Sequence, residues 1–461
     1  MPSSSHSTMQ PRSWHSVAAY TIFMIYGLVY LGSWNTWITA NGFFKSRFTG
    51  SIFADTFMSY FAICYMVVMF ACLTLFLAKP NAIALNARVI IGHTLIILIF
   101  SAAAIMALLS LDPYVYFFLT LCLIVLSSVA TSFQAAAYGI LPLYPPIYSS
   151  AFMSGQGLAG LIPSLVQLAL TASSVNAGTD SYRAFAYFFL TIFLATGVMI
   201  GYQKLLPNLP VKRSIEYQQA NTEDHEDDDV ASDIDIIDEG DIVNPSTSSI
   251  GVGKDKLYWP VFQKVYLLGG SLWLGFVITL ASFPAITSAV ESTSSNTLLV
   301  PIHFVIFNLF DLLGKTLPGC PSLFIKSPTI LFILSVARLV FPPAFLLCNV
   351  TFHDRFGNIL GRTLPLVFGK DWMFLGITAA FALSNGYVDA ACIMAAPLLI
   401  PDGPRREDGD DEEDDGRPTA RIQREGAGAF MVACISCGLL VGSMSSFLLR
   451  YLLCNCNPFY S

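Results

Sequence analysis

Long apolar stretches separated by short polar breaks run along almost the whole chain. Each is longer than the roughly 20 residues that an α-helix needs to cross a bilayer. We count eleven: residues 17–40, 54–78, 88–110, 114–141, 149–173, 183–205, 262–290, 297–319, 327–349, 370–396 and 426–452. The break between 114–141 and 149–173 is the least clear, but its sequence LPLYPPIYSS is rich in proline, which ends helices. The pattern predicts an all-α integral membrane protein with eleven transmembrane helices.

Composition supports the membrane assignment. The chain is 54% hydrophobic and only 12% charged, whereas soluble domains carry about 25% charged residues. So much apolar surface does not fit into one soluble core, so most of it must face lipid or other membrane helices. Residues 1–16 are polar, and the first apolar run is too long for the core of a signal peptide. We therefore expect that run to remain as the first helix.

Two acidic segments divide the chain. Residues 222–241 hold 11 acidic side chains and residues 402–415 hold 9, which together are 20 of the chain's 31. Like-charge runs of this kind are typical of disordered linkers, and a regulatory segment is the alternative. The predicted organisation is a tail (1–16), a first helical half of six spans (17–205), an acidic loop (206–261), a second half of five spans (262–452, with an acidic loop at 397–425) and a tail (453–461).

The distribution of Lys and Arg predicts the orientation. With the N-terminus inside, 15 basic residues fall on cytoplasmic segments and seven on the other side. Basic residues near span ends favour the cytoplasmic face. We therefore expect a cytoplasmic N-terminus, cytoplasmic acidic loops and an extracellular or lumenal C-terminus.

The stretch FNLFDLLGKTLPG, residues 307–319, places charges inside an apolar span. Ionisable residues are costly there and often functional. At 100° per residue, Asn308, Asp311 and Lys315 fall on one face of a helix, and the last two can pair at i,i+4. One interpretation is a polar stripe along a cavity, in which the carboxylate accepts hydrogen bonds from ligand hydroxyls. The other is a neutral pair that only joins two helices.

Further polar and aromatic groups lie inside other spans. The amide of Gln134 suits the edge of a heterocyclic base, or else an interhelical hydrogen bond. Trp34 is suited to stacking on a flat ligand, or to ordinary packing. The glycines Gly155, Gly157 and Gly160 match a dinucleotide-binding pattern, but they open no βαβ unit, so we assign them to helix packing.

The sequence offers no catalytic or metal-binding motif. The six histidines are scattered, and most of the ten cysteines lie in spans, where we interpret them as small apolar packing residues. We expect no enzyme activity, cofactor, metal or nucleic-acid partner. Polar groups spread over many spans favour a multispan transporter of a small polar solute.

The motifs together resemble the equilibrative nucleoside transporter family. The motifs, in order along the chain, are WNTWITA, MSGQGLAG, FVITLASFPAIT, FNLFDLLGK, ARLVFPPAFLLCN and LSNGY, followed by GAGAFMVACISCGLLVGS in the last span. The resemblance covers nearly the whole chain outside the N-terminus and the acidic loops. It implies a major-facilitator-like fold in a six-plus-five arrangement, joined by the long cytoplasmic loop.

The resemblance also implies roles for residues. Asp311 and Lys315 would contact the ribose hydroxyls, Gln134 would read the base, and Trp34 would form an apolar wall with Leu31 and Ile38. The chain departs from the family at Ser33, where many members have proline, and at Lys315, where arginine is usual. It also places Asp389 where small or apolar residues are usual. Asp389 and Asp311 are therefore candidate carriers of a coupled proton; the alternative is that Asp389 pairs with Lys315 or Arg338.

We thus expect a plasma-membrane carrier of nucleosides, with nucleobases as a wider substrate class, that works by facilitative alternating access. The alternatives are a proton-coupled symporter, a major-facilitator carrier of another solute, a non-transporting receptor with this fold, and residence in an internal membrane.

Overall fold

The computed structural model of the chain describes residues 14–53, 57–79, 82–172, 180–205, 254–294, 296–351, 364–400 and 417–454. Within these ranges the chain is helical, apart from turns and two isolated β-bridges, Val290 with Val350 and Cys348 with Phe368. The acidic stretches 222–241 and 402–415 lie outside the described residues.

Six long helices form what we call the first half: α1 (Trp14–Thr39), α3 (Phe57–Ala78), α4 (Leu85–Ala107), α5 (Pro113–Gln134), α7 (Pro146–Ala172) and α8 (Asp180–Ile200). Between or after them lie α2 (Asn41–Phe48), α6 (Ala137–Ile140), η2 (Leu141–Leu143) and η4 (Gly201–Leu205). The proline-rich break predicted between the fourth and fifth spans is present, because the chain is extended at Tyr144 before α7 begins.

The second half contains α10 (Lys254–Ser282), α11 (Leu299–Thr316), α12 (Pro328–Ala337), α13 (Phe341–Leu346), α14 (Asp371–Ala395) and α15 (Arg417–Cys454). Its short turns are η7 (Thr287–Ala289), η8 (Leu317–Gly319), η9 (Pro321–Leu323), η10 (Arg338–Val340) and η11 (Ala396–Leu399). The predicted span 327–349 is interrupted at η10. Pro342 and Pro343 lack amide hydrogens, so the carbonyls of Arg338 and Leu339 have no partner four residues later. The carbonyl of Arg338 instead accepts from the amide of Phe341, in a 3-10 turn.

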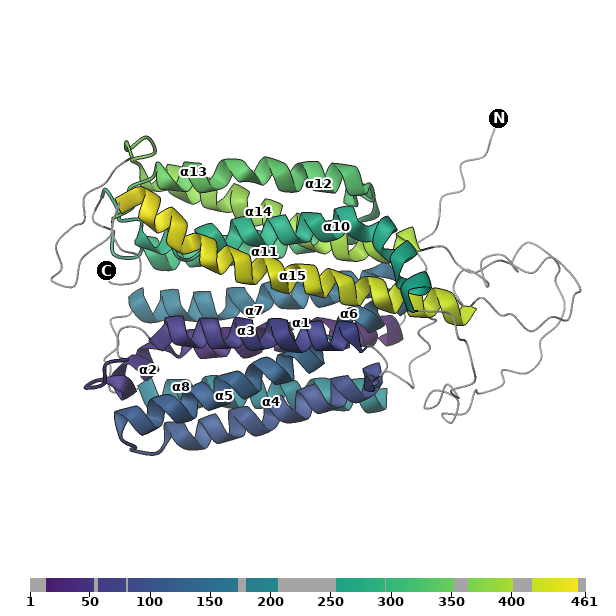
Figure 1. The fold of residues 1–461 in the computed structure, drawn as a ribbon. Helices are drawn as coiled ribbons and strands as arrows, with labels where there is room; N and C mark the ends of the chain where they lie inside the picture. The colour runs from purple at the N-terminus through teal and green to yellow at the C-terminus, as the bar shows by residue number, and fades with distance from the viewer. Residues whose placement is uncertain are drawn as a thin grey trace, which may run out of the picture.

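The two halves lie side by side in one elongated bundle, with the first half running from purple to blue and the second from teal through green to yellow (Figure 1). α1 packs against α7, α10 against α15 and α11 against α14, while α11 with α7 and α15 with α3 join the halves. We call the end where α1 begins and α8 ends the proximal end, and the opposite end distal. This arrangement matches the predicted six-plus-five division.

Nine helical segments of the described chain are long and apolar enough to cross a membrane. α3 and α7 are not among them, yet they have 22 and 27 residues, or about 33 and 40 Å, and both lie in the same bundle. Small and polar residues such as those of SGQG lower the hydropathy of α7. The nine segments together with α3 and α7 are consistent with eleven spans.

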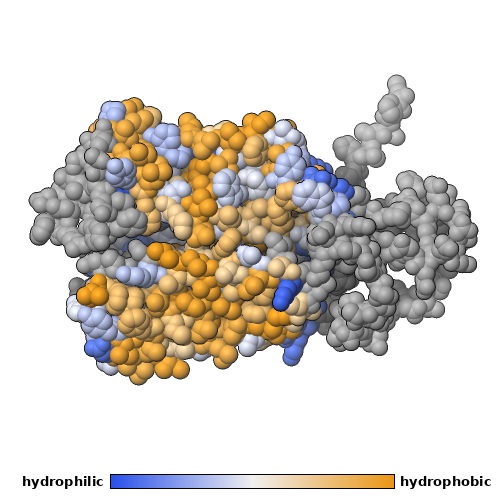
Figure 2. Space-filling model, viewed as in Figure 1, coloured by the Kyte–Doolittle hydropathy of each residue, from blue (hydrophilic) through white to orange (hydrophobic). Residues whose placement is uncertain are grey.

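The surface and the core fit a membrane environment. Apolar residues dominate the middle of the visible face, and polar residues gather towards its two ends (Figure 2). Large apolar side chains such as Phe193, Leu75 and Val340 are 62–68% exposed, which lipid tolerates and water does not. Most of the buried apolar residues fall into two clusters, a larger one centred on the first half and a smaller one within the second.

Three helices extend beyond the spans predicted from hydropathy. α1 already begins at Trp14, inside the predicted tail 1–16, and α10 begins at Lys254, inside the predicted loop 206–261. α15 begins at Arg417, inside the predicted loop 397–425, and ends at Cys454. Hydropathy marks only the apolar part of a helix, whereas backbone hydrogen bonds continue through its polar ends.

Candidate functional site

α11 and α14 meet along a seam that changes from aromatic to polar. The buried residues of α11 recur every four positions at 303, 307, 311 and 315, and residues of α14 meet them in the same order. From the distal side, the pairs are His303–Phe374 (ring centroids 5.2 Å), Phe307–Phe381 (6.0 Å), Asp311–Asn385 (Oδ1 to Nδ2 2.7 Å) and Lys315–Asp389 (Nζ to Oδ2 3.6 Å). The four residues of the two polar pairs are only 4–6% exposed.

Two glycines allow α11 and α14 to approach this closely. A Cβ atom at Gly386 would lie 2.0 Å from the carbonyl oxygen of Asp311, and one at Gly314 would lie 2.3 Å from that of Leu383. Both values are far below van der Waals contact, so any larger residue would force the helices apart. The backbone contact therefore sets the distance across the polar pairs.

Lys315 lies between two carboxylates. Its Nζ is 2.9 Å from Oδ2 of Asp311 and 3.6 Å from Oδ2 of Asp389. The first distance is that of a charge-assisted hydrogen bond, and the second is that of a looser ion pair. Oδ1 of Asp389 has no hydrogen-bond partner in the described part of the chain. Of the two partners considered for Asp389 from sequence, the ion pair formed is with Lys315.

Arg338 and Asn385 extend the network towards α10. Nη2 of Arg338 donates to Oδ1 of Asn385 at 2.9 Å and to Oγ1 of Thr279 at 2.8 Å, and Nη1 donates to the carbonyl of Gly275 at 3.2 Å. The hydroxyl of Thr279 is also 2.7 Å from Oδ1 of Asn385. From the sequence, Arg338 was considered as a partner of Asp389, and the amide of Asn385 and the hydroxyl of Thr279 were missed. The position of Asn385 four residues before Asp389 was the available signal.

The network balances its own charge. Asp311 and Asp389 contribute two formal negative charges, and Lys315 and Arg338 contribute two positive ones. Buried charges are tolerated when they are paired and hydrogen-bonded, and removing one partner is strongly destabilising. A formally neutral but highly polar cluster is therefore buried between α10, α11 and α14.

Asn308, placed on the same helix face as Asp311 and Lys315 from the sequence, lies against α7. A Cβ atom at Gly160 of α7 would lie 1.9 Å from its Oδ1, and its Nδ2 donates to the carbonyl of Phe304 at 2.8 Å. The structure therefore brings Asp311 and Lys315 together, while Asn308 packs against α7. The other glycines of this run also lie at helix contacts: a Cβ at Gly155 would be 1.8 Å from the carbonyl oxygen of Met24, and one at Gly157 would be 2.8 Å from Leu312.

The three residues of the predicted apolar wall, Trp34, Leu31 and Ile38, all belong to α1. The ring of Trp34 is half-buried, with its centroid 4.5 Å from that of Tyr65 at an interplanar angle of 36°. The hydroxyl of Tyr65 is in turn 2.8 Å from Oγ1 of Thr131. Leu31 is half-buried, whereas Ile38 is 39% exposed.

Gln134 ends α5 and is fully buried. Its backbone carbonyl accepts a hydrogen bond from the hydroxyl of Tyr26 at 2.8 Å. Neither polar atom of its side-chain amide has a hydrogen-bond partner among the described residues. Gly92 lies close by, since a Cβ there would be 2.8 Å from Cγ of Gln134. The interhelical hydrogen bond considered from sequence is therefore made by the backbone and not by the amide.

The halves touch closely at the proximal end. A Cβ atom at Gly428 of α15 would lie 1.9 Å from the carbonyl oxygen of Tyr138, and one at Gly319 would lie 2.5 Å from Oγ of Ser150. A small cavity beside these contacts is lined from both halves, by residues that include Tyr138, Ser149, Ile393 and Pro397. The described chain is thus closed between its halves at this end.

No group of three or more His, Cys, Asp or Glu side chains in the described ranges is arranged to hold a metal ion. Cys434 and Cys437, the predicted packing cysteines of the last span, are free thiols on α15.

Comparison with known proteins places the chain in a family. The sequence profile of the nucleoside transporter family matches residues 118–409, which is more than half of the chain. Equilibrative nucleoside transporter 1 of Rattus norvegicus is 28% identical over 488 residues, covering 94% of this chain and 97% of that protein. Equilibrative nucleoside transporter 2 of Mus musculus is 29% identical over 479 residues, covering 94% and 96%. The nucleoside transporter FUN26 of Saccharomyces cerevisiae is 25% identical and covers 94% and 84%.

Solved structures agree on the fold. A proton:xylose symporter of the major facilitator superfamily superposes with a TM-score of 0.51 at 13% identity, covering 95% of this chain and 87% of that one. The fucose:proton symporter of E. coli gives a TM-score of 0.51 at 10% identity, covering 96% and 98%. The fold is therefore major-facilitator-like, as predicted, and the chain belongs to the nucleoside transporter family.

Proposed function

We propose that the protein carries nucleosides across a membrane by alternating access between its two helical halves. The observation that carries this proposal is the neutral, buried polar network of α11 and α14, set in an apolar bundle of the major-facilitator type. The family match and relatives named as transporters support the same reading and argue against an enzyme. Nucleobases are the wider substrate class.

The site residues follow from their chemistry. Ionised Asp311 accepts hydrogen bonds from the sugar hydroxyls, and Lys315 donates from beside it. The amide of Gln134, whose donor and acceptor are both unused in the described chain, reads the edge of the base. Trp34, with Leu31 and Ile38 one turn to either side, provides the apolar wall. Asn308 borders the site from the α7 side.

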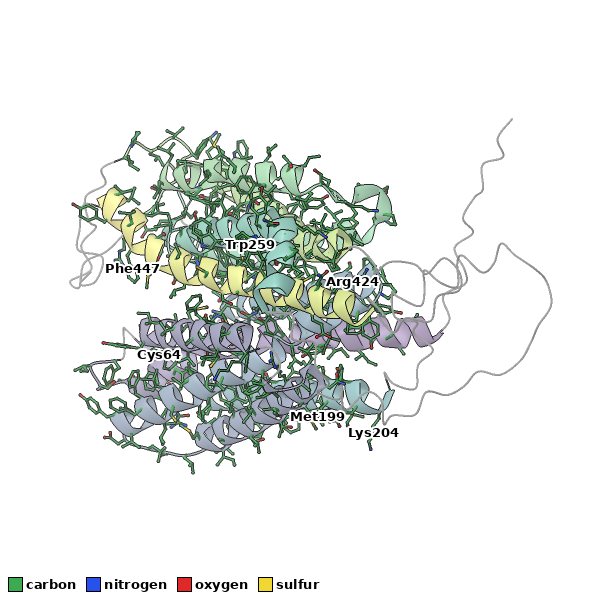
Figure 3. The ribbon with its side chains drawn as sticks, turned by 45° about the vertical axis from the view of Figure 1, so that its right-hand side comes forward. Cys64, Met199, Lys204, Trp259, Arg424 and Phe447 are labelled. Atoms are coloured by element: carbon green, nitrogen blue, oxygen red, sulfur yellow. The ribbon has the colours of Figure 1, made fainter. Side chains whose placement is uncertain are left out.

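Alternating access requires the proximal contacts to open. The pairs Gly428–Tyr138 and Gly319–Ser150 close that end, so the substrate would enter distally and leave once these contacts separate. We assign the proximal end to the cytoplasm, because Lys204 and Arg424 both lie towards it (Figure 3). The C-terminus is then extracellular or lumenal. We propose the plasma membrane as the location, and cell fractionation tests this.

Facilitative flow is the proposed mode, and proton symport is the second candidate. The partnerless Oδ1 of Asp389 favours the second, because a buried carboxylate oxygen without a donor is a place for a proton. Asp311 is the other candidate carrier. The titratable or charged groups that interact with Asp389 are Lys315, Asp311, Arg338, Tyr30, Tyr138 and Cys392.

Uptake of radiolabelled adenosine into proteoliposomes, with and without an inward proton gradient, tests the proposal. Uptake to equal concentrations in both conditions indicates facilitative transport, and accumulation only with the gradient indicates symport. Asp311→Asn should reduce uptake at least about tenfold through loss of a charged hydrogen-bond acceptor. The control is Asp112→Asn, which changes the N-cap of α5 to an equally good cap. Adenosine binding without uptake would favour a receptor; absence of both would favour a carrier of another solute.

A further inference from the structure

The two carboxylates that bind Lys315 differ in how many of their oxygens have a partner. Asp311 is engaged at both oxygens, since Oδ1 accepts from Nδ2 of Asn385 at 2.7 Å and Oδ2 binds Nζ of Lys315 at 2.9 Å. Asp389 contacts the same ammonium group at 3.6 Å, and its Oδ1 has no partner in the described ranges although the residue is only 4% exposed. An ionised carboxylate offers about four lone-pair positions. Asp389 therefore holds acceptor capacity that the described network does not use.

Of the two partners of Asp311, Lys315 is the one with a second carboxylate within reach. Asn385 is held by donors from two other elements, Arg338 and Thr279, at 2.9 and 2.7 Å. Lys315 instead carries a compact ammonium group on a flexible four-carbon stem. Its two carboxylate distances differ by 3.6 − 2.9 = 0.7 Å. A shift of that size would convert the looser ion pair with Asp389 into a full charge-assisted hydrogen bond.

We propose that Asp389 is a positioning residue of the nucleoside site, which receives the Lys315 ammonium group when sugar hydroxyls bind Asp311. This inference rests on the proposed function, in which Asp311 accepts hydrogen bonds from those hydroxyls. A hydroxyl that donates to Oδ2 of Asp311 competes with Lys315 for the same atom. Because Asp389 lies beside it, the Lys315 ammonium group leaves Oδ2 of Asp311 and still pairs with a carboxylate. It therefore does not become an unpaired buried charge, which is strongly unfavourable.

Removing the charge of Asp389 should therefore weaken the binding of hydroxyl-bearing ligands selectively. In Asp389→Asn the ammonium group has only one anionic partner, so the hydroxyls must displace it into an unpaired state or bind less well. The test measures equilibrium binding of radiolabelled adenosine and 2′,3′-dideoxyadenosine to the purified full-length protein. We expect the variant to bind adenosine about tenfold more weakly, and the dideoxy compound to change less than about twofold.

Two further variants distinguish the positioning role of Asp389 from a general loss of folded protein. Asp389→Glu keeps a carboxylate within reach of Lys315 and should retain most of the preference for adenosine. Thr378→Val is the matched control, because Thr378 is also buried on α14 and its hydroxyl donates within its own helix, to the carbonyl of Phe374. This control should bind both ligands as the wild type does. The ratio of the two affinities is measured on one preparation, so partial unfolding does not alter it.

The outcomes are distinct. Loss of the preference for adenosine in Asp389→Asn, and its return in Asp389→Glu, would support the positioning role. Equal weakening of both ligands, or no change in either, would overturn it. If the wild type binds both compounds equally, the sugar hydroxyls are not held by Asp311, and the inference fails with that assignment. If the wild type binds neither compound, the proposed nucleoside function itself fails.

Discussion

A single methyl group added at Gly386, as in Gly386→Ala, should disrupt the geometry of the site most. A Cβ atom there would lie 2.0 Å from the carbonyl oxygen of Asp311 and 2.9 Å from the amide nitrogen of Lys315. Both neighbours are backbone atoms of a helix, so they cannot rotate away. Ordinary contact begins near 3.4 Å, so Gly386→Ala requires the two helices to separate by 3.4 − 2.0, or about 1.4 Å.

The separation has a calculable effect on the polar pairs. Adding about 1.4 Å to the 2.7 Å between Nδ2 of Asn385 and Oδ1 of Asp311 gives about 4.1 Å, beyond the range of a hydrogen bond. Overpacking costs about 1–3 kcal/mol, and a lost hydrogen bond to a charged group costs about 1.5–3 kcal/mol. We expect Gly386→Ala to lower the apparent Tm of the purified protein by on the order of 5–10 °C and adenosine uptake at least about tenfold.

Gly376 provides the matched control on the same helix. A Cβ atom there meets nothing within 4 Å, and alanine is the better helix former by about 1 kcal/mol. Gly376→Ala should therefore melt at the wild-type temperature or slightly above and transport normally. Thermal unfolding and proteoliposome uptake are measured on both variants. Equal melting and equal uptake for the two would refute the view that the crossing of α11 and α14 fixes the site.

Three other perturbations test separate parts of the molecule. Arg338→Met removes one of the four buried charges and should lower the free energy of unfolding by about 3–5 kcal/mol. Arg338→Lys should lower it less, and denaturant or thermal unfolding measures both variants. Gly428→Ala should push α15 away from the carbonyl of Tyr138 and favour the proximally open state; a cysteine introduced at Ser149 should then react faster with an impermeant maleimide added from that side. Deleting residues 222–241 tests the prediction that this segment is only an acidic linker, for which uptake per molecule should be unchanged.

The candidate site was only partly predictable because sequence spacing defines a face of one helix and not the neighbour that it meets. The i,i+4 spacing of Asp311 and Lys315 was enough to predict their pairing. The same argument grouped Asn308 with them, yet Asn308 meets Gly160 of α7 while the other two meet α14. At about 100° per residue, a modest difference in angle selects a different neighbour in a crowded bundle.

Residues missed from the sequence were those whose role depends on distant segments. Thr279 and Asn385 are separated by 106 positions, yet both accept from one guanidinium group. A threonine or asparagine inside an apolar span can form hydrogen bonds with several kinds of partner. Only the packing of α10, η10 and α14 determines which partner it has. Likewise, the sequence left open whether Gln134 makes an interhelical hydrogen bond through its amide; in the structure its backbone carbonyl accepts one from Tyr26, and the amide has no partner in the described chain.

By itself the sequence determined that this is an all-helical membrane protein, where most of its spans lie, and which buried charges need explanation. Those properties depend on local composition, because a bilayer requires about 20 apolar residues and a fully hydrogen-bonded backbone in every span. Only the tertiary structure decided that Lys315 is shared by two carboxylates, that Arg338 is held by Asn385, and that the halves close proximally through Gly428. These depend on distances between helices, which close contacts at glycines set and which no periodicity along one chain encodes.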